Sequence, residues 1–352
     1  MGSVRFLDGI NIDPDDYIWW YHDNVPSQPR LKVFLNNHRD HVIFARFRKM
    51  DNVFLGRFRE KGARKSLYPY ISKYFSMIKR SKLILLAANH DPGLKRITGD
   101  QIEKNKQLLH TASLKNGTAI QKVENAESLF IMQNCIGGIQ YPHYIPDIFE
   151  TVPKNIIRIY TKALGVLDDP VFKPLPNGMN WREAPARVET IKRLSSKEKK
   201  NTNLLYINMD ETMNVERVTL VERLKSEKWL TMGKGVGDKF LEEIYHHKFC
   251  LSPTGNCADS HRTWESLYLG TIPIVLKTDQ MSWFSDLPIL QVDKWEDVTE
   301  SFLNREYERI HSSYYNMEKI RLSYWLDDIS EDYRKNIMNV IGTIASAVPV
   351  VK

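Results

Sequence analysis

The segment from Lys248 to Lys277 constrains the fold of this chain more than any other stretch of its sequence. An apolar run at Phe249 to Leu251 is followed by the turn-forming residues Ser-Pro-Thr-Gly-Asn, by a helical pattern from Asp259 to Leu269, and by a second apolar run at Ile272 to Leu276. This order predicts a strand, a tight loop, a helix and a second strand. Two strands joined in this way form a parallel pair, and ligands of parallel sheets bind at the carboxyl ends of the strands. We therefore expect an α/β fold with a ligand site at the loop.

Polar side chains gather where this helix begins, whereas Trp264, Leu267 and Tyr268 fall on one buried face. The helix N-terminus offers free N–H groups and a partial positive charge to an anion, and Arg262 adds a planar cation suited to phosphate oxygens. Glu265, one turn further, can accept hydrogen bonds from two ribose hydroxyl groups. These features predict a nucleotide-diphosphate site. The alternative is that Arg262 and Glu265 form an exposed helical pair worth only ~0.3 kcal/mol.

The pattern S-P-x-G-N-x-x-D-x-H-R-x-W-E-x-L-x-x-G-x-I-P-I-V in this segment resembles the donor-binding segment of exostosin-like glycosyltransferases. Looser similarity extends from about Phe172 to Asp293. The resemblance implies a GT-B fold, in which two Rossmann-like domains face each other across a cleft and C-terminal helices cross back to the first domain. It also implies an inverting transfer of sugar from a nucleotide-sugar. The residues that we expect to bind the donor are Arg262, Glu265, Arg217, Asn208, Ser252, Gly255, Asn256, Asp259, His261 and Lys234.

Three of these donor-site candidates precede the main segment. The apolar run from Asn203 to Asn208 predicts the first strand of the donor-binding part, and Arg217 falls on the first turn of the helix that follows. A helix N-terminus disfavours a cation, so an anionic ligand would explain this position. Lys234 lies in the Gly-Lys-Gly turn after a strand at Trp229 to Thr231, where it is placed to contact the base or the phosphates. This turn is a weak signal, because no Walker pattern surrounds it.

The length of 352 residues suits two domains of ordinary size. The run from Pro174 to Gly178 marks a break, and the segment from Trp181 to Lys200 predicts a solvated connecting helix. We expect an acceptor-side α/β domain, a linker and a nucleotide-sugar-binding domain at residues 1–178, 179–200 and 201–352, respectively. The last of these would end in closing helices, predicted at Asn304 to Asp327 and Glu331 to Ala347.

Apolar runs in the N-terminal half predict a second sheet. The aromatic run from Ile18 to Tyr21 can stack on sugar rings, but we expect it to pack against the protein, because aromatic side chains bury large areas. The predicted strands are Leu31 to Leu35, His41 to Phe47, Leu83 to Leu86, Ser128 to Met132, Asn155 to Tyr160 and Val171 to Leu175.

An inverting transfer needs a base that removes the proton of the acceptor hydroxyl group. His90 and Asp91 follow the predicted strand at Leu83 to Leu86 and are the first candidates, and His143, in a cluster of aromatic residues, is a further one. The alternatives are that Asp91 serves only the turn that it forms with Pro92 and Gly93, and that His143 is structural.

The composition favours an anionic partner without choosing one. The net charge is +7 and the pI is about 9.0, which suits nucleotide-sugars, acidic glycans, nucleic acid or a membrane surface. Three cysteines, Cys135, Cys250 and Cys257, lack the spacing of a disulfide framework or a zinc site and favour a reducing compartment. No stretch has the ~20 apolar residues of a membrane span, and no signal peptide is apparent. We expect a soluble cytoplasmic protein, in a viral or bacterial setting, unlike the Golgi-anchored animal exostosins.

The predicted function is therefore an inverting, metal-independent transfer to a glycan or glycoprotein hydroxyl group. Retaining GT-B enzymes often carry an acidic residue eight positions before the donor-contacting glutamate, and here that residue is Cys257. The predicted site contains no Asp-x-Asp motif, so we expect no obligatory divalent metal and no other cofactor. The alternatives are an enzyme that uses another nucleotide, a glycan-binding protein without catalysis, or a nucleic-acid-binding protein. Nucleic acid is the least expected partner, because the basic residues are spread along the whole chain.

Overall fold

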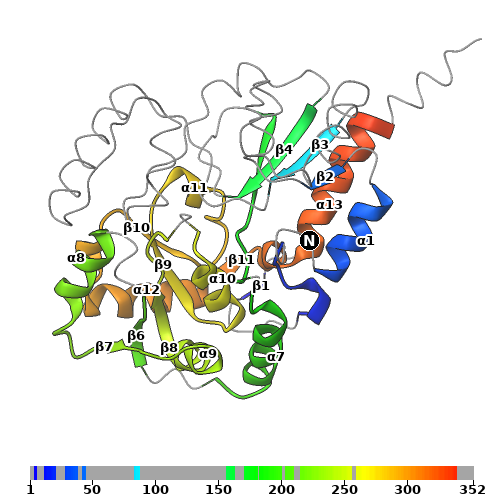
Figure 1. The fold of residues 1–352 in the computed structure, drawn as a ribbon. Helices are drawn as coiled ribbons and strands as arrows, with labels where there is room; N and C mark the ends of the chain where they lie inside the picture. The colour runs from blue at the N-terminus through cyan, green and yellow to red at the C-terminus, as the bar shows by residue number, and fades with distance from the viewer. Residues whose placement is uncertain are drawn as a thin grey trace, which may run out of the picture.

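The described part of the chain has a mixed α/β fold with two parallel sheets, shown with their helices in the computed structural model in Figure 1. The predicted α/β class is confirmed. A short antiparallel pair, β1 (Val4–Arg5) with β11 (Tyr314–Tyr315), joins the N-terminal end to a late segment of the chain. The structure describes residues 4–5, 12–20, 28–38, 42–44, 83–87, 156–162, 170–180, 182–199, 203–209, 215–255 and 259–338.

The larger sheet has five parallel strands, and helices connect them. The strands are β6 (Asn203–Ile207), β7 (Leu230–Met232), β8 (His247–Leu251), β9 (Ile272–Leu276) and β10 (Leu290–Val292), in the spatial order β10-β9-β8-β6-β7. The helices are α8 (Val215–Leu224), α9 (Asp238–Tyr245), α10 (His261–Tyr268), α11 (Asp279–Ser282) and α12 (Glu300–Ser312). The predicted strand–loop–helix–strand unit is confirmed as β8, α10 and β9, with β8 and β9 paired in parallel.

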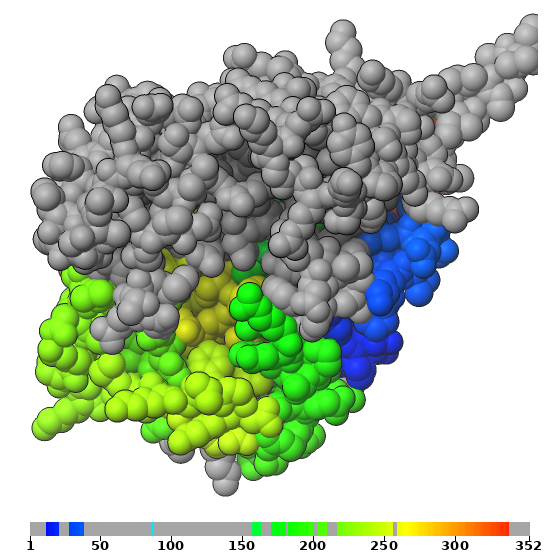
Figure 2. Space-filling model, viewed as in Figure 1, coloured from blue at the N-terminus to red at the C-terminus, as the bar shows by residue number. Residues whose placement is uncertain are grey.

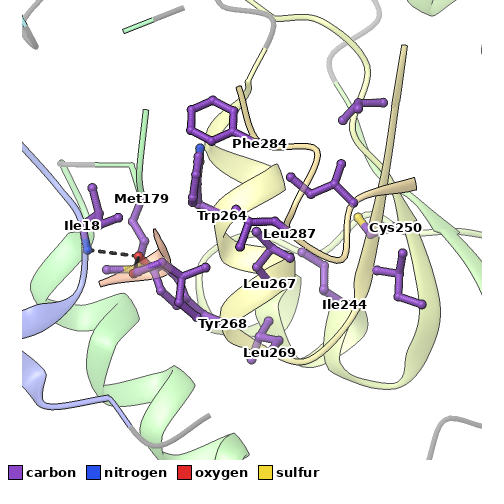
Figure 3. Packing of buried hydrophobic residues seen from close by; sticks show 14 of the residues in the cluster. Ile18, Met179, Ile244, Cys250, Trp264, Leu267, Tyr268, Leu269, Phe284 and Leu287 are labelled. Atoms are coloured by element: carbon purple, nitrogen blue, oxygen red, sulfur yellow. Dashed lines mark hydrogen bonds between the residues drawn. The ribbon is translucent and has the colours of Figure 1, made fainter. Parts of the chain in front are cut away.

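Helix α10 packs into the centre of the core, as its apolar face predicts (Figure 3). Trp264 and Leu267 are fully buried, and the Trp264 ring meets the Phe284 ring edge-on, with centroids 5.2 Å apart. The Tyr268 hydroxyl accepts a hydrogen bond from Ile18 N at 3.1 Å and donates one to Ile320 O at 2.9 Å. A buried tyrosine needs such partners. These bonds connect α10 to two segments far from it in the sequence.

The N-terminal aromatic residues are packed into the protein, as predicted. Ile18, Trp19 and Trp20 are buried, and Trp20 Nε1 donates a hydrogen bond to Pro176 O at 2.7 Å. The single Asp-x-Asp triplet of the sequence, residues 13–15, lies just before them. Asp13 there accepts a hydrogen bond from the backbone of Asp15 and caps a short 3₁₀ turn, so a local structural role accounts for this triplet.

The smaller sheet has four parallel strands, so the second sheet expected in this half is confirmed. They are β2 (Val42–Phe44), β3 (Leu83–Ala87), β4 (Ile156–Lys162) and β5 (Phe172–Leu175), in that spatial order. The strand predicted at Leu31 to Leu35 is wrong, because this segment lies in the helix α1 (Pro29–Asn37). The Gln28 side chain caps this helix by accepting a hydrogen bond from Leu31 N at 2.7 Å, and Pro29 stands at its start. The predicted strand at Ser128 to Met132 lies outside the described residues.

The connecting segment is a helix, α7 (Ala184–Ser195), but the prediction that it is solvated is wrong. Val188, Ile191 and Leu194 are buried at a spacing of three residues, whereas Lys192 and Arg193 point outward. The buried face of α7 packs against α9 of the five-stranded sheet. The prediction missed this amphipathic pattern because the charged residues at the end of the segment indicated a solvated helix.

The C-terminal segment runs back to the four-stranded sheet, where α13 (Leu322–Tyr333) lies beside β2 and β3 in Figure 1. On α13, Asp332 accepts hydrogen bonds from Arg158 Nε at 3.0 Å and from the Tyr160 hydroxyl at 2.7 Å, both on β4. The single helix predicted from Asn304 to Asp327 is wrong, since α12 ends at Ser312 and the pairing of β11 separates it from α13. No helix among the described residues combines the length and apolarity that crossing a membrane requires.

Candidate functional site

A cavity of about 250 Å³ lies where loops from both sheets meet. Its walls come from the segment after β5, the loop after β8 and the start of α10, together with single residues of α7, α8 and α9. In Figure 2 the yellow atoms of the α10 region lie in a recess between the lime atoms of the α8–α9 region and the green atoms that lead into α7. The lining residues are Asn177, Asn180, Arg187, Arg217, Phe240, Gly255, Ser260, His261, Arg262 and Glu265.

Three guanidinium groups face one carboxylate in this cavity. Arg187, Arg217 and Arg262 line it together with Glu265, the one acidic residue among its lining residues. Glu265 is only 2% exposed, and its Oε1 lies 2.7 Å from Arg187 Nη1. The Asn180 backbone amide donates a longer hydrogen bond to the same oxygen, at 3.4 Å. The surplus of positive charge makes the cavity suited to an anion.

Arg262 lies on the first turn of α10. Ser260 occupies the N-cap position but makes no side-chain capping hydrogen bond. The Arg262 guanidinium lies over the Phe240 ring, 5.7 Å from its centroid, and its Nε is buried without a hydrogen-bond partner in the part of the chain that the structure describes. A buried N–H group without a partner costs about 1–3 kcal/mol, so an anionic ligand would stabilise this arrangement.

Arg217, on the first turn of α8, holds the loop after β8. Its Nε donates a hydrogen bond to Thr254 O at 3.1 Å, and its Nη2 lies 3.4 Å from Pro253 O. A Cβ atom at Gly255 would lie 3.1 Å from the same guanidinium group, so glycine permits this close approach. Arg217 thus has a structural task that the sequence did not predict, in addition to its place in the cavity wall.

His261 connects the start of α10 to the segment after β5. Its Nδ1 lies 2.8 Å from Gly178 O, and because a carbonyl oxygen only accepts, Nδ1 carries the proton. Gly178 has a φ of 71°, and a Cβ atom there would meet Ile18 O at 2.3 Å. Glycine is therefore required at this position on two grounds, backbone conformation and space.

The geometry joins five of the predicted donor-site residues in one cavity: Arg217, Gly255, His261, Arg262 and Glu265. No protein-family model matches this chain. What the cavity binds is therefore argued from its own side chains. A helix N-terminus, three guanidinium groups and a buried carboxylate suit a ligand that carries both anionic oxygens and hydroxyl groups.

The other predicted donor-site residues lie outside the cavity wall or outside the described residues. Ser252 Oγ lies 2.7 Å from Ser260 Oγ and 2.8 Å from Thr263 Oγ1, and thereby fastens the loop to α10. Asn208 donates hydrogen bonds to the Tyr206 hydroxyl at 3.0 Å and to Gly235 O at 2.8 Å. Lys234 is exposed. Asn256, His90, Asp91 and His143 lie outside the described residues.

Asp259 is part of the scaffold beneath the cavity. Its Oδ2 accepts hydrogen bonds from Asn177 N at 2.6 Å and from Trp264 Nε1 at 3.1 Å. Burial raises the pKa of this carboxyl group to about 7, although the hydrogen bond from Asn177 and the Lys162 ammonium group act in the opposite direction. On the other side, Lys162 Nζ donates a hydrogen bond to Asn177 Oδ1 at 2.9 Å. Asp259 therefore positions a residue of the cavity wall from behind.

Sequence reasoning missed five residues of the cavity wall. Part of the signal was present, because the region in which we predicted donor-site residues begins near Phe172 and includes the segment after β5. For the two residues on α7 and α9 no local pattern was available, because the folding of distant helices brings them to the cavity. The missed residues are Asn177, Asn180, Arg187, Phe240 and Ser260.

Proposed function

We propose that this chain is an inverting glycosyltransferase that moves a sugar from a nucleotide diphosphate sugar to a hydroxyl group of a glycan or glycoprotein. The observation that carries the proposal is the convergence of Arg187, Arg217 and Arg262 with buried Glu265 at the N-terminus of α10. A nucleotide diphosphate matches this set, since its phosphates are anionic and its ribose presents two adjacent hydroxyl groups. At about 250 Å³ the cavity is smaller than a typical pocket for a whole ligand, so it encloses the diphosphate and adjoining groups and leaves the ends of the donor outside.

In the proposed reaction, the acceptor oxygen bonds to the anomeric carbon as the bond from that carbon to the diphosphate oxygen breaks. The hydroxyl proton passes to a base, for which His90, Asp91 and His143 remain the candidates. Negative charge grows on the departing diphosphate, and Arg262, Arg217 and the helix N-terminus stabilise it. This differential stabilisation lowers the barrier, because the charge is larger in the transition state than in the bound donor.

The proposal includes a GT-B arrangement, with the four-stranded sheet on the acceptor side and the five-stranded sheet on the donor side. Two contacts favour it. The cavity is lined by segments that follow strands of both sheets, and α13 returns from the donor side to bind Arg158 and Tyr160 of β4. We retain residues 1–178 and 201–352 as the proposed domains and group α7 with the second, because it packs on α9.

Ligand binding tests the proposal directly. In a panel of UDP, GDP, CMP and their sugar conjugates, we expect one nucleoside diphosphate or its sugar conjugate to raise the melting temperature, both in EDTA and with Mg²⁺, and CMP to have no effect. At a ligand concentration of 100 times Kd, binding stabilises the folded protein by about 2.7 kcal/mol. Arg262→Ala should weaken binding at least tenfold, because a charge-assisted hydrogen bond contributes about 1.5–3 kcal/mol. Glu265→Ala should also weaken it. Arg309→Ala, which changes an exposed arginine on α12, is the control and should bind as the wild type does.

Other outcomes would favour the alternatives. Binding of an oligosaccharide without any effect of nucleotides would favour a glycan-binding protein. Binding of nucleic acid with a steep salt dependence would favour a nucleic-acid-binding protein. Unchanged nucleotide affinity in both Arg262→Ala and Glu265→Ala would remove the proposed donor site.

A further inference from the structure

Arg187 comes from α7, a helix for which we predicted only a connecting role, yet its side chain is nine-tenths buried in the cavity wall. Its Nε and Nη2 donate hydrogen bonds to Glu183 Oε2 at 2.8 and 2.6 Å, one turn earlier on the same helix. Its guanidinium also lies over the Phe240 ring, 5.6 Å from the centroid. These contacts fix the plane of the guanidinium fork before any ligand arrives.

The remaining nitrogen, Nη1, is directed at Glu265. It lies 2.7 Å from Oε1 without the linear geometry of a hydrogen bond. The Asn180 amide contacts the same oxygen, so both contacts of this carboxylate are made to Oε1 and none is made to Oε2 by the described residues. A buried carboxylate without a counterion is costly. Arg187 therefore supplies the counterion of Glu265 and fixes its orientation.

We propose that Arg187 is a positioning residue that sets the preference of the site for a ligand with two adjacent hydroxyl groups. Arg187 acts through Glu265: it occupies Oε1 and thereby presents Oε2 to the sugar hydroxyls of the nucleotide. This inference rests on the proposed function, in which Glu265 receives the ribose of the donor. The selection of ribose over 2′-deoxyribose then depends on Arg187, which lies outside the segment from Lys248 to Lys277.

The ratio of two affinities tests this role. A hydrogen bond from a ribose hydroxyl to an ionised carboxylate is strong, so the wild type should prefer a ribonucleotide over its 2′-deoxy analogue by roughly 10- to 100-fold. Arg187→Met keeps the length of the side chain and its packing on Phe240 but removes the charge. Without its counterion, Glu265 is no longer held in this orientation, and the preference should fall below about threefold. Arg187→Lys should restore part of the preference, because it returns the charge without the planar fork.

The experiment measures the Kd of UDP, GDP, dUDP and dGDP by calorimetry for the wild type and the variants. Arg193→Met on the exposed face of the same helix is the matched control, because Arg193 contacts Glu242 at 2.9 Å outside the cavity. The preference should be unchanged in this control. Glu265→Gln should lower the preference, and adding Arg187→Met to it should cause no further change, since the effect of Arg187 passes through the carboxylate.

Two results would overturn the inference, and they differ from each other. If the wild type binds one diphosphate with a clear ribose preference and Arg187→Met weakens both analogues equally, Arg187 is only structural and the proposed function stands. If the wild type binds none of the four nucleotides, the proposed function fails and the role of Arg187 fails with it. A circular dichroism spectrum and a melting curve of each variant establish that it is folded.

Discussion

Replacing Asp259 by asparagine tests the interpretation that this carboxyl group belongs to the scaffold of the cavity. The carboxyl group is buried, its Oδ2 accepts hydrogen bonds from Asn177 and Trp264, and its Oδ1 has no hydrogen-bond partner among the described residues. Asparagine has the same shape and keeps the accepting oxygen, but it carries no charge at any pH. The substitution therefore preserves both hydrogen bonds and removes the cost of a buried negative charge.

The size and the sign of the effect follow from the pKa of Asp259, which burial raises from 3.8 to about 7. Because the folded pKa lies above the unfolded one, protonation favours the folded state. The stabilising contribution is complete below about pH 4 and is lost as the pH rises to about 7. Three pKa units, each worth about 1.36 kcal/mol, set an upper limit of about 4 kcal/mol on the loss. Between pH 5 and pH 8, the wild type should lose about 2–3 kcal/mol of stability through the ionisation of Asp259.

Urea unfolding of the wild type and Asp259→Asn at pH 5 and pH 8 measures this loss. We expect the stability of the variant relative to the wild type to rise by about 2–3 kcal/mol between pH 5 and pH 8. Asp293→Asn, which changes a carboxyl group that is 82% exposed, should follow the wild type at both pH values. If the wild type and Asp259→Asn lost stability in parallel, Asp259 would already be ionised at pH 5, and the reasoning would be refuted. Loss of nucleotide binding in a folded Asp259→Asn variant would instead make Asp259 a ligand contact.

Two further substitutions test packing, one beside the cavity and one between α13 and β4, and both are measured by urea unfolding. Gly178→Ala should lower the free energy of unfolding by about 2–5 kcal/mol, because it adds a clash to the strain of a positive φ. Gly237→Ala, at a φ of 56° with no atom near the new Cβ, should lower it by only about 1–2 kcal/mol. If both variants were destabilised equally, the expected clash of the new Cβ at position 178 would be contradicted. Asp332→Asn should cost about 3 kcal/mol by leaving Arg158 without its buried counterion. The pKa of Asp332 is lowered because Lys173 and Tyr160, through their hydrogen bonds, outweigh burial, so the wild type should approach this variant in stability as the pH falls below 4.

The parts of the fold that were predictable are those that local patterns determine. The apolar runs of β8 and β9 bury both of their faces, and a continuous apolar run is the direct consequence of such burial. Leu31 to Leu35 shows how the same reasoning fails. Its side chains suit a strand, but Gln28 and Pro29 immediately before it are helix-start residues, and they determine the outcome. The signal was present in the sequence and was given too little weight.

The site was predictable mainly where its residues are neighbours in the chain, and Arg217, on the first turn of α8, is the exception. Gly255, His261, Arg262 and Glu265 lie within eleven positions of one another, and one loop followed by one helix turn brings them together. Burial, in contrast, is a property of the whole fold. Asp259 has the polar side chain and the position of a ligand contact, and only the packing of Trp264 and the loop after β5 reveals that it faces the interior. For this reason the sequence favoured a binding role for it.

The segment after β5 explains how the two sheets act on one cavity. It leaves the four-stranded sheet at Leu175, and Lys162 of that sheet holds Asn177 Oδ1 at 2.9 Å. On the side of the five-stranded sheet, Asp259 in the loop before α10 and His261 at the start of α10 hold the same segment, and His261 binds the Gly178 carbonyl. A displacement of one sheet relative to the other must therefore move a part of the cavity wall. In an enzyme that binds its donor on one sheet and its acceptor on the other, a movement of the acceptor side would therefore shift the part of the cavity wall that faces the donor.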